Sequence, residues 1–251
     1  MPKLKLKNID TRAPKKLNKE TIKKETVKLK FRLEELQNLL YAESKHALLV
    51  VLQGMDASGK DGVAKNVFDA VNPMGCRVVP FKKPTEPEMK HDFLWRIHQQ
   101  VPEKGMITIF NRSHYEDVII QRVHQWVDEP TIKQRFVHIN NFEKLLEETG
   151  TVVLKFYLHV SKEEQLVRLQ ERLSDPTKMW KHNDTDLKER EFWNDYMKAY
   201  EDAFECCNEA TDWNIIPSDQ NWYKEYLIAK KVVATLEGLK MKFPGLKTGT
   251  P

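Results

Sequence analysis

The stretch Ala47–Asp61, ALLVVLQGMDASGKD, decides the fold of this chain. It begins with an apolar run, Leu48–Leu52, that is typical of a buried strand in a parallel sheet. The next residues, Gly54–Lys60, have the spacing G-x-x-x-x-G-K of a P-loop, in which backbone N–H groups surround a phosphate at the start of a helix. Lys60 adds a mobile positive charge over the bound phosphates. The phosphate ligands that this pattern predicts are Gly54, Ala57, Ser58, Gly59, Lys60 and Asp61.

Position 61 departs from the usual form of the motif. Asp61 stands where a Ser or Thr hydroxyl normally holds Mg²⁺. The motif therefore predicts a Mg·nucleotide donor less strongly here than in an ordinary P-loop protein. The alternative is a plain glycine-containing turn between a core strand and a helix. The helix expected over 61–71 favours the phosphate-binding interpretation.

The size of the chain fits one α/β domain with a lid or an appended helix, not two equal domains, because it has 251 residues. Its net charge is +4, but residues 1–45 carry 13 Lys and Arg against 6 Asp and Glu, so the rest has a net charge of −3. We expect a basic arm over 1–17 and one domain over 18–239, beginning with a helix over 18–41. A tail follows over 240–251.

The three cysteines, Cys76, Cys206 and Cys207, have neither disulfide-framework nor zinc-site spacing, which is typical of a reducing compartment. The N-terminus has no apolar signal-peptide core, and no run approaches the roughly 18 apolar residues of a membrane span. We therefore expect a cytoplasmic protein without a membrane segment.

Strand patterns alternate with helical patterns along the chain. After the first strand, further strands are expected at 76–81, 106–110, 151–160 and 212–217. The helices expected after the P-loop helix cover 87–100, 131–148, 161–173, 187–210 and 221–239. This alternation predicts an α/β fold of the P-loop kinase type: a doubly wound, five-stranded parallel sheet with helices on both faces and a helical lid.

Charged residues follow the second and third expected strands, where the ligand crevice of an open parallel sheet lies. Lys82 and Lys83 come after the second strand. After the third, Arg112 is a candidate phosphate ligand and Asp117 a candidate metal ligand, because P-loop proteins place a metal-binding carboxylate there. Ordinary interpretations exist for both, namely a solvated lysine pair and the capped first turn of a helix.

The segment over 168–190 is the expected lid. Residues 174–186 are polar and combine cations with Trp180, which resembles the lid of nucleotide-type kinases that closes over phosphates. A surface connection with solvated charges is the alternative. The cations expected to face phosphate are Arg168, Arg172, Lys178 and Lys181.

Four motifs in this order resemble the polyphosphate kinase 2 family. They are GMDASGKDG at 54–62, FKKPT at 81–85, FNRSHYEDV at 110–118 and RLQERLSDPTKMWK at 168–181. The similarity runs from about residue 20 to residue 238, and four ordered motifs are far more specific than the P-loop alone. The resemblance implies reversible phosphoryl transfer between inorganic polyphosphate and ADP, AMP or both, with Mg²⁺ or Mn²⁺, in a homo-oligomer.

The resemblance also assigns roles to single residues. In the family, an Asp in the P-loop, matching Asp56, and one after the third strand, matching Asp117, hold the metal, and the loop does not rely on Ser or Thr at position 61. The acceptor is an ionised phosphate, with a second pKa of about 6, so no strong general base is needed. The residues that would hold the phosphate chain are Lys60, Lys82, Lys83, Arg112, Arg168, Arg172, Lys178 and Lys181.

Two other classes of protein share parts of this pattern. An ATP-dependent nucleoside monophosphate kinase of the thymidylate-kinase type has the P-loop and the basic lid, but it expects Ser or Thr at position 61. A non-catalytic module that binds RNA or another polyanion through the basic arm and first helix predicts salt-sensitive binding that survives Asp117→Asn. With polyphosphate and purine nucleotides as substrates, neither a nucleic-acid partner nor a membrane partner is expected.

Overall fold

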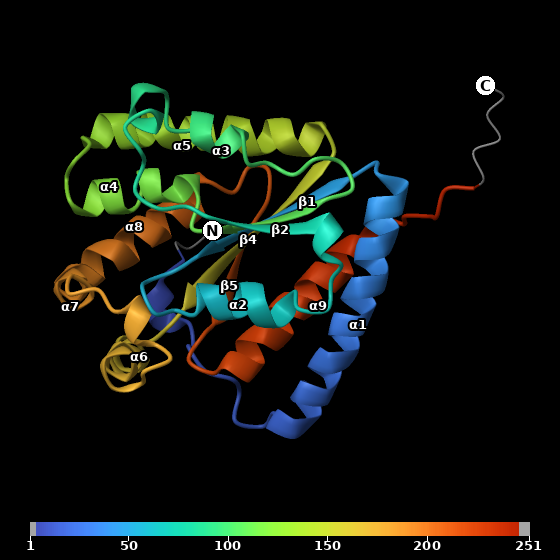
Figure 1. The fold of residues 1–251 in the computed structure, drawn as a ribbon. Helices are drawn as coiled ribbons and strands as arrows, with labels where there is room; N and C mark the ends of the chain where they lie inside the picture. The colour runs from blue at the N-terminus through green and yellow to red at the C-terminus, as the bar shows by residue number, and fades with distance from the viewer. Residues whose placement is uncertain (1–3, 246–251) are drawn as a thin grey trace.

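The computed structural model describes residues 4–245, which form a five-stranded parallel sheet with helices on both faces (Figure 1). The strand order is β2-β3-β1-β4-β5. The strands are β1 (Ala47–Gln53), β2 (Cys76–Pro80), β3 (Ile107–Asn111), β4 (Thr151–His159) and β5 (Trp213–Pro217). The predicted doubly wound sheet is confirmed, with each strand within two residues of its expected bounds.

The central strand β1 places the P-loop at the middle of one sheet edge. All seven of its residues are buried, as expected for a strand covered on both faces. It pairs with β3 through Leu52 and Asn111, and with β4 through Gln53 and Tyr157. Because the strands are parallel, their carboxyl ends meet at this edge, and the loops that follow them surround the P-loop.

Helices cover both faces of the sheet and bury two separate cores. One face carries α1 (Lys19–Glu43), α2 (Lys60–Val67) and α9 (Asn221–Gly238), which pack against one group of buried apolar residues. The other face carries α5 (Glu129–Glu148) and α8 (Trp193–Cys206) over a second group. The short helices α3 (Trp95–His98) and α4 (Ile120–Val123) lie on this second side (Figure 1).

The lid expected from the sequence is helical. Its first part is the end of α6 (Lys162–Ser174), and its last part is the single turn α7 (Asp186–Glu189), with a 3-10 turn at Met179–Lys181 between them. Ser161 caps α6 by accepting a hydrogen bond from the Glu164 backbone at 3.1 Å. In Figure 1 these segments project from one end of the sheet, beyond α2.

Two expected helices are shorter than their patterns indicate. The helix expected over 87–100 is reduced to α3, because the Asp92 carboxylate accepts from the Leu94 backbone at 2.9 Å and holds a turn there. The helix expected over 187–210 is interrupted by a 3-10 turn at Arg190–Phe192. Arg190 donates to the Lys162 carbonyl at 2.9 Å, so a tertiary contact with α6 determines where α8 begins.

The described part of the N-terminal arm includes a 3-10 turn at Leu6–Asn8 and contacts two distant segments of the chain. Leu6 is fully buried, and its backbone N–H donates to Glu201 of α8 at 2.8 Å. Further along, the Thr11 hydroxyl donates to Asp219 at 2.8 Å, in the loop between β5 and α9. Residues 1–3 of the expected arm and 246–251 of the expected tail lie outside the described residues.

No helix within residues 4–245 is long and apolar enough to cross a membrane.

Candidate active site

A cavity of about 620 Å³ lies where the P-loop, the ends of β2 and β3, the lid and the start of α9 meet. Of the described residues that line it, eight are cations and five are carboxylates, so its walls carry excess positive charge. The cations are Lys60, Lys82, Arg112, Arg168, Arg172, Lys178, Lys181 and Lys224. A polyanion is the ligand class that such a surface attracts.

The P-loop has the strained backbone that its glycines allow. Gly54 and Gly59 have φ of +152° and +97°, and Ala57 also lies in the left-handed region with φ of 58°. A Cβ on Gly54 would come within 2.9 Å of the Leu158 carbonyl oxygen, so only glycine fits against β4 there. The buried Ser58 hydroxyl oxygen has no hydrogen-bond partner among the described residues.

Lys60 lies in the concavity of its own loop. Its side chain is 8% exposed, and the ammonium donates to the Gly54 carbonyl at 2.6 Å and the Met55 carbonyl at 3.1 Å. Burial, with a smaller contribution from Arg112, lowers the pKa of Lys60 to about 8. An anion in the loop would offer this ammonium a charged acceptor in place of two neutral carbonyls.

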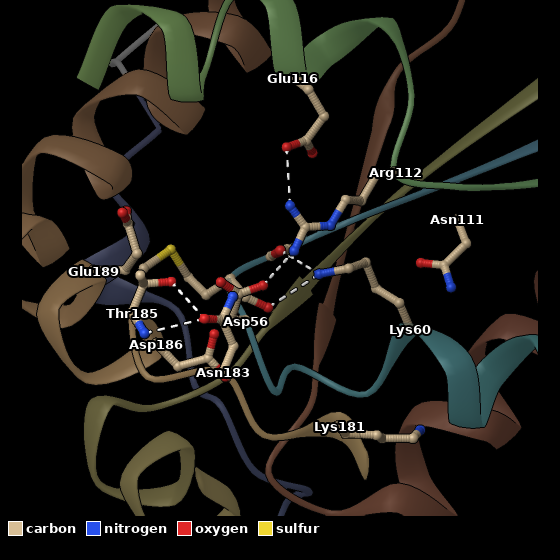
Figure 2. A network of polar contacts seen from close by, with 12 residues as sticks. Asp56, Lys60, Asn111, Arg112, Glu116, Lys181, Asn183, Thr185, Asp186 and Glu189 are labelled. Atoms are coloured by element: carbon tan, nitrogen blue, oxygen red, sulfur yellow. Dashed lines mark hydrogen bonds and ion pairs between the residues drawn. The ribbon is translucent and has the colours of Figure 1, made fainter. Parts of the chain in front are cut away.

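Arg112 joins two carboxylates across the mouth of the loop (Figure 2). It donates to Asp56 at 2.5 Å and to Glu116 at 3.3 Å, and its own φ is +64°. Burial alone would raise the pKa of Asp56, but the positive charges of Arg112, Lys60 and Arg172 hold it below its usual value. Asp56 is therefore ionised at neutral pH and faces the cavity as a carboxylate.

Asp117 and Asp56, which the sequence predicts as metal ligands, line different cavities. Asp117 lines the second cavity described below, where Arg96 is 3.7 Å from its Oδ2 atom. Burial raises the pKa of Asp117 to about 6. Within residues 4–245 no group of three or more His, Cys, Asp or Glu side chains is arranged to hold a metal ion.

The chemistry of these two carboxylates nevertheless suits Mg²⁺. The buried Oδ2 atom of Asp117 has no hydrogen-bond partner among the described residues. Mg²⁺ is usually held by one or two carboxylates together with substrate phosphates and water, not by a complete protein cage. A shared ion would also need these phosphates, because Asp56 and Asp117 line different cavities.

The second cavity, of about 910 Å³, adjoins the first and shares Phe81, Lys82 and Arg112 with it. Its walls combine cations with apolar side chains. The cations are Lys82, Lys83, Arg96, Arg112 and Arg135, and the apolar side chains are Phe81, Pro84, Met89, Phe93, Ile120 and Trp126. Sequence reasoning found Lys82, Lys83 and Arg112 here. It missed Arg96 and Arg135, since they occur within ordinary helical patterns.

The lid cations face the first cavity while paired with acidic side chains. Arg172 donates to Asp186 at 2.7 Å, and Lys178 donates to Glu171 at 2.8 Å. Lys181 crosses the cavity to donate to Asp61 at 2.5 Å (Figure 2 shows Lys181 near the start of α2).

Asp61 therefore has a specific place at the P-loop position that usually carries Ser or Thr. It also accepts from the side chain of Asn111, at the end of β3, at 2.8 Å. Its carboxylate thus connects the P-loop helix, β3 and the lid, which the sequence pattern did not reveal.

Arg168, a predicted phosphate ligand, lines the first cavity but is also bonded to the chain around it. Its five N–H donors are already used: Nε donates to Glu164, Nη1 to the carbonyls of Ala57 and Ser58, and Nη2 to those of Ser218 and Asp219. A direct bond to phosphate would require one of these contacts to break. The geometry instead makes Arg168 a clamp that holds the P-loop against α6 and the β5–α9 loop.

A P-loop that opens into a cationic cavity beneath a helical lid is the arrangement of a P-loop kinase, and the fold and site define this class. The sequence profile of Polyphosphate kinase 2 (PPK2) matches residues 16–244. The chain therefore belongs to the polyphosphate kinase 2 family, as the four motifs predict.

Known relatives match over most of their length. An AMP/ADP-polyphosphate phosphotransferase of Meiothermus ruber is 52% identical over 87% of this chain and 82% of the relative. An ADP-polyphosphate phosphotransferase of Rhodopseudomonas palustris is 42% identical over 85% and 78%. The crystal structure of polyphosphate kinase 2 from Arthrobacter aurescens TC1 superposes with a TM-score of 0.95 at 39% identity, covering 100% of this chain and 91% of that one.

Proposed function

We propose that this protein reversibly transfers a phosphoryl group between inorganic polyphosphate and ADP, AMP or both, with Mg²⁺ as cofactor and Mn²⁺ as an alternative. The observation that carries the proposal is the pair of adjoining cavities, which meet at Lys82 and Arg112. One is cationic and lies over the P-loop, and the other combines cations with aromatic side chains. The relatives named above are phosphotransferases that use polyphosphate with ADP or AMP.

The polyphosphate chain is assigned to the first cavity. Each internal phosphate unit carries a negative charge, and a series of cations from the P-loop to the lid matches such a repeating anion. Lys181 and Lys178 can exchange their carboxylate partners for phosphate oxygens, since both ion pairs are partly exposed. This assignment agrees with the loop carrying Asp61 in place of a metal-binding hydroxyl.

The acceptor nucleotide is assigned to the second cavity. Trp126 is 64% exposed and stacks on His124 with ring centroids 4.8 Å apart, so its other face is available to a base. Arg96, Arg135 and Lys83 supply positive charge for the nucleotide phosphates. The terminal phosphate of the acceptor would then reach the junction beside Arg112.

Transfer at this junction depends mainly on positioning and on neutralising charge. Lys60 and Arg112 would hold the reacting phosphates, and the lid would exclude water so that the phosphoryl group is not lost to hydrolysis. Because the acceptor is already ionised near neutral pH, no side chain has to remove its proton. Asp56 and Asp117 would hold Mg²⁺, which supplies neutralisation of the developing charge.

The test is to mix the purified protein with long-chain polyphosphate, Mg²⁺ and either ADP or AMP, and to separate the nucleotides by chromatography. We expect ATP from ADP, and product from AMP would extend the acceptor range. Asp117→Asn should abolish transfer. Transfer only from ATP to a nucleoside monophosphate would identify a different donor, and salt-sensitive RNA binding without transfer would identify a polyanion-binding module.

The homo-oligomer that the family resemblance implies is tested separately. Light scattering coupled to size-exclusion chromatography gives the mass in solution, to be compared with the 29.6 kDa of one chain. A mass of one chain would contradict the expectation.

A further inference from the structure

Lys224 is a buried cation of the first cavity to which the function proposed above gives no individual role. It lies in the first turn of α9 and is 1% exposed. Its ammonium donates to the Ser58 carbonyl at 3.3 Å and to the side-chain oxygen of Asn221 at 2.9 Å. Both acceptors are neutral, and within the described part of the chain Lys224 forms no ion pair.

The ammonium lies directly against the P-loop. A Cβ on Gly59 would come within 2.2 Å of the Lys224 Nζ atom, so the lysine occupies the space that glycine leaves free. Gly59 is the residue before α2, and Lys224 therefore stands beside the positive end of that helix. It lines the phosphate cavity together with Asn66 of α2 and Glu225 of α9, which are joined by a hydrogen bond of 2.7 Å.

A buried charge without a counter-ion is costly, and this one has no evident structural need. Burial, with a smaller contribution from Arg168, lowers the pKa of Lys224 to about 7, while Glu225 and Glu164 act weakly in the other direction and Lys60 adds to the lowering. Burial of an unpaired ammonium is ordinarily avoided or compensated by an anion. An uncharged side chain of the same length would fill this space at lower cost. A bound anion would supply the missing counter-ion.

We propose that Lys224 binds a phosphate unit of the donor chain, forming a subsite between α2 and α9 at the Gly59 end of the P-loop. The inference rests on polyphosphate being the donor. Lys224 lines the first cavity alone, whereas Lys82 and Arg112 at the junction line both cavities. Asn66, Asn221 and Glu225 line the same cavity.

The subsite is a place for a phosphate unit that does not react. Its contribution should therefore appear in the affinity for the donor and not in the chemical step or in the affinity for the nucleotide. This separates it from a structural role, because a lysine that only supported the Ser58 carbonyl would change the loop, and with it kcat and both Michaelis constants.

The experiment compares Lys224→Met with the matched control Lys231→Met, an exposed lysine on the same helix. Isothermal titration with tripolyphosphate, without nucleotide, should show about 10-fold weaker binding in Lys224→Met and no change in the control, since the loss of one charged contact corresponds to about one factor of ten. In steady-state assays with ADP, the KM of Lys224→Met for polyphosphate should rise by a similar factor. Its kcat and its KM for ADP should stay within about twofold of the wild-type values.

Unchanged tripolyphosphate binding in Lys224→Met would overturn the inference. A fall in kcat together with rises of similar size in both Michaelis constants would also overturn it, in favour of a structural role. Lys224→Gln, which keeps a donor for the Ser58 carbonyl and removes only the charge, replaces the methionine variant if that variant does not fold. If the wild-type protein makes no ATP from polyphosphate, the proposed function fails, whereas the titration still decides the role of Lys224.

Discussion

The two walls of the first cavity, which we assign to polyphosphate, hold their positive charge in different ways. In the floor, formed by the P-loop and its supports, Lys60 and Lys224 are 8% and 1% exposed and donate to neutral oxygens of the chain. In the lid, the side chains of Lys178 and Lys181 are 44% and 32% exposed and are paired with carboxylates. Within residues 4–245 Lys60 and Lys224 form no ion pair, whereas Lys178 and Lys181 do.

This difference indicates two separate contributions to anion binding. The floor is preorganised, because its cations are fixed before a phosphate arrives and regain a counter-ion when it binds. The lid must exchange one anion for another, which yields a small net gain and allows closure to be reversible. Mutations in the floor should therefore cost much more than mutations in the lid.

The largest effect is expected for Lys60→Met. It removes the buried ammonium inside the loop, and we expect kcat/KM for polyphosphate to fall by about 10³-fold, in the range for loss of a preorganised electrostatic contact. The control is Lys65→Met, an exposed lysine on the same helix that should keep activity within about twofold. A decrease of less than tenfold for Lys60→Met would mean that the floor does not dominate transition-state binding.

A smaller but still large effect is expected for Arg168→Lys, which keeps the charge but cannot make five contacts. We expect a fall in thermal midpoint of about 5 °C and a loss of kcat/KM of about 30-fold, because the P-loop loses its clamp. The control is Arg32→Lys. Arg32 is an exposed arginine on α1 that pairs with Glu35 and Glu237, and the midpoint of this variant should stay within about 1 °C of the wild-type value. A variant that keeps its midpoint and loses only polyphosphate affinity would instead support Arg168 as a direct phosphate ligand, as the sequence predicts.

Local features of the chain could be predicted from the sequence, and contacts between distant segments could not. Apolar runs of strand length and the spacing of the P-loop are local signals, so the five strands and the phosphate loop were predictable. Contacts between distant segments were not. Lys224 meets the Ser58 carbonyl across 166 residues, and Lys181 meets Asp61 across 120.

The roles of single site residues were also only partly predictable. Motif spacing located Arg112 and Asp117 after β3, but the pairing of Arg112 with Asp56 depends on the parallel register of β1 and β3. Arginine is a residue type that often binds phosphate. The carbonyls to which Arg168 donates, however, belong to loops that no local pattern places beside α6. Residue type and motif indicated which region binds phosphate, and packing decided which cations remain available.

In the lid, Asp61→Asn and Lys181→Met should have opposite and modest effects. Loss of the Asp61 charge frees Lys181, so the KM for polyphosphate should fall about twofold, whereas Lys181→Met should raise it about threefold, as expected for partly exposed ion pairs. Lys188→Met, an exposed lysine on α7, is the control. Raising the salt concentration should reduce both differences. A rise in KM with Asp61→Asn would show that Asp61 assists binding and does not compete with phosphate.

The last prediction concerns stability in place of activity and isolates the buried charge of Lys224 without any substrate. Because its pKa is lowered to about 7 in the folded protein, against 10.5 for an exposed lysine, the unfolded chain binds more protons between these pH values. The free energy of unfolding should therefore rise with pH in this window, by at most about 1.4 kcal/mol per pH unit relative to Lys224→Met. Urea unfolding of both proteins at pH 7 and pH 9 measures the difference, and contributions of other groups common to both cancel. An equal change in the free energy of unfolding of the two proteins would mean that Lys224 keeps its proton between pH 7 and pH 9. A group of the protein itself would then supply the counter-ion that we assign to polyphosphate.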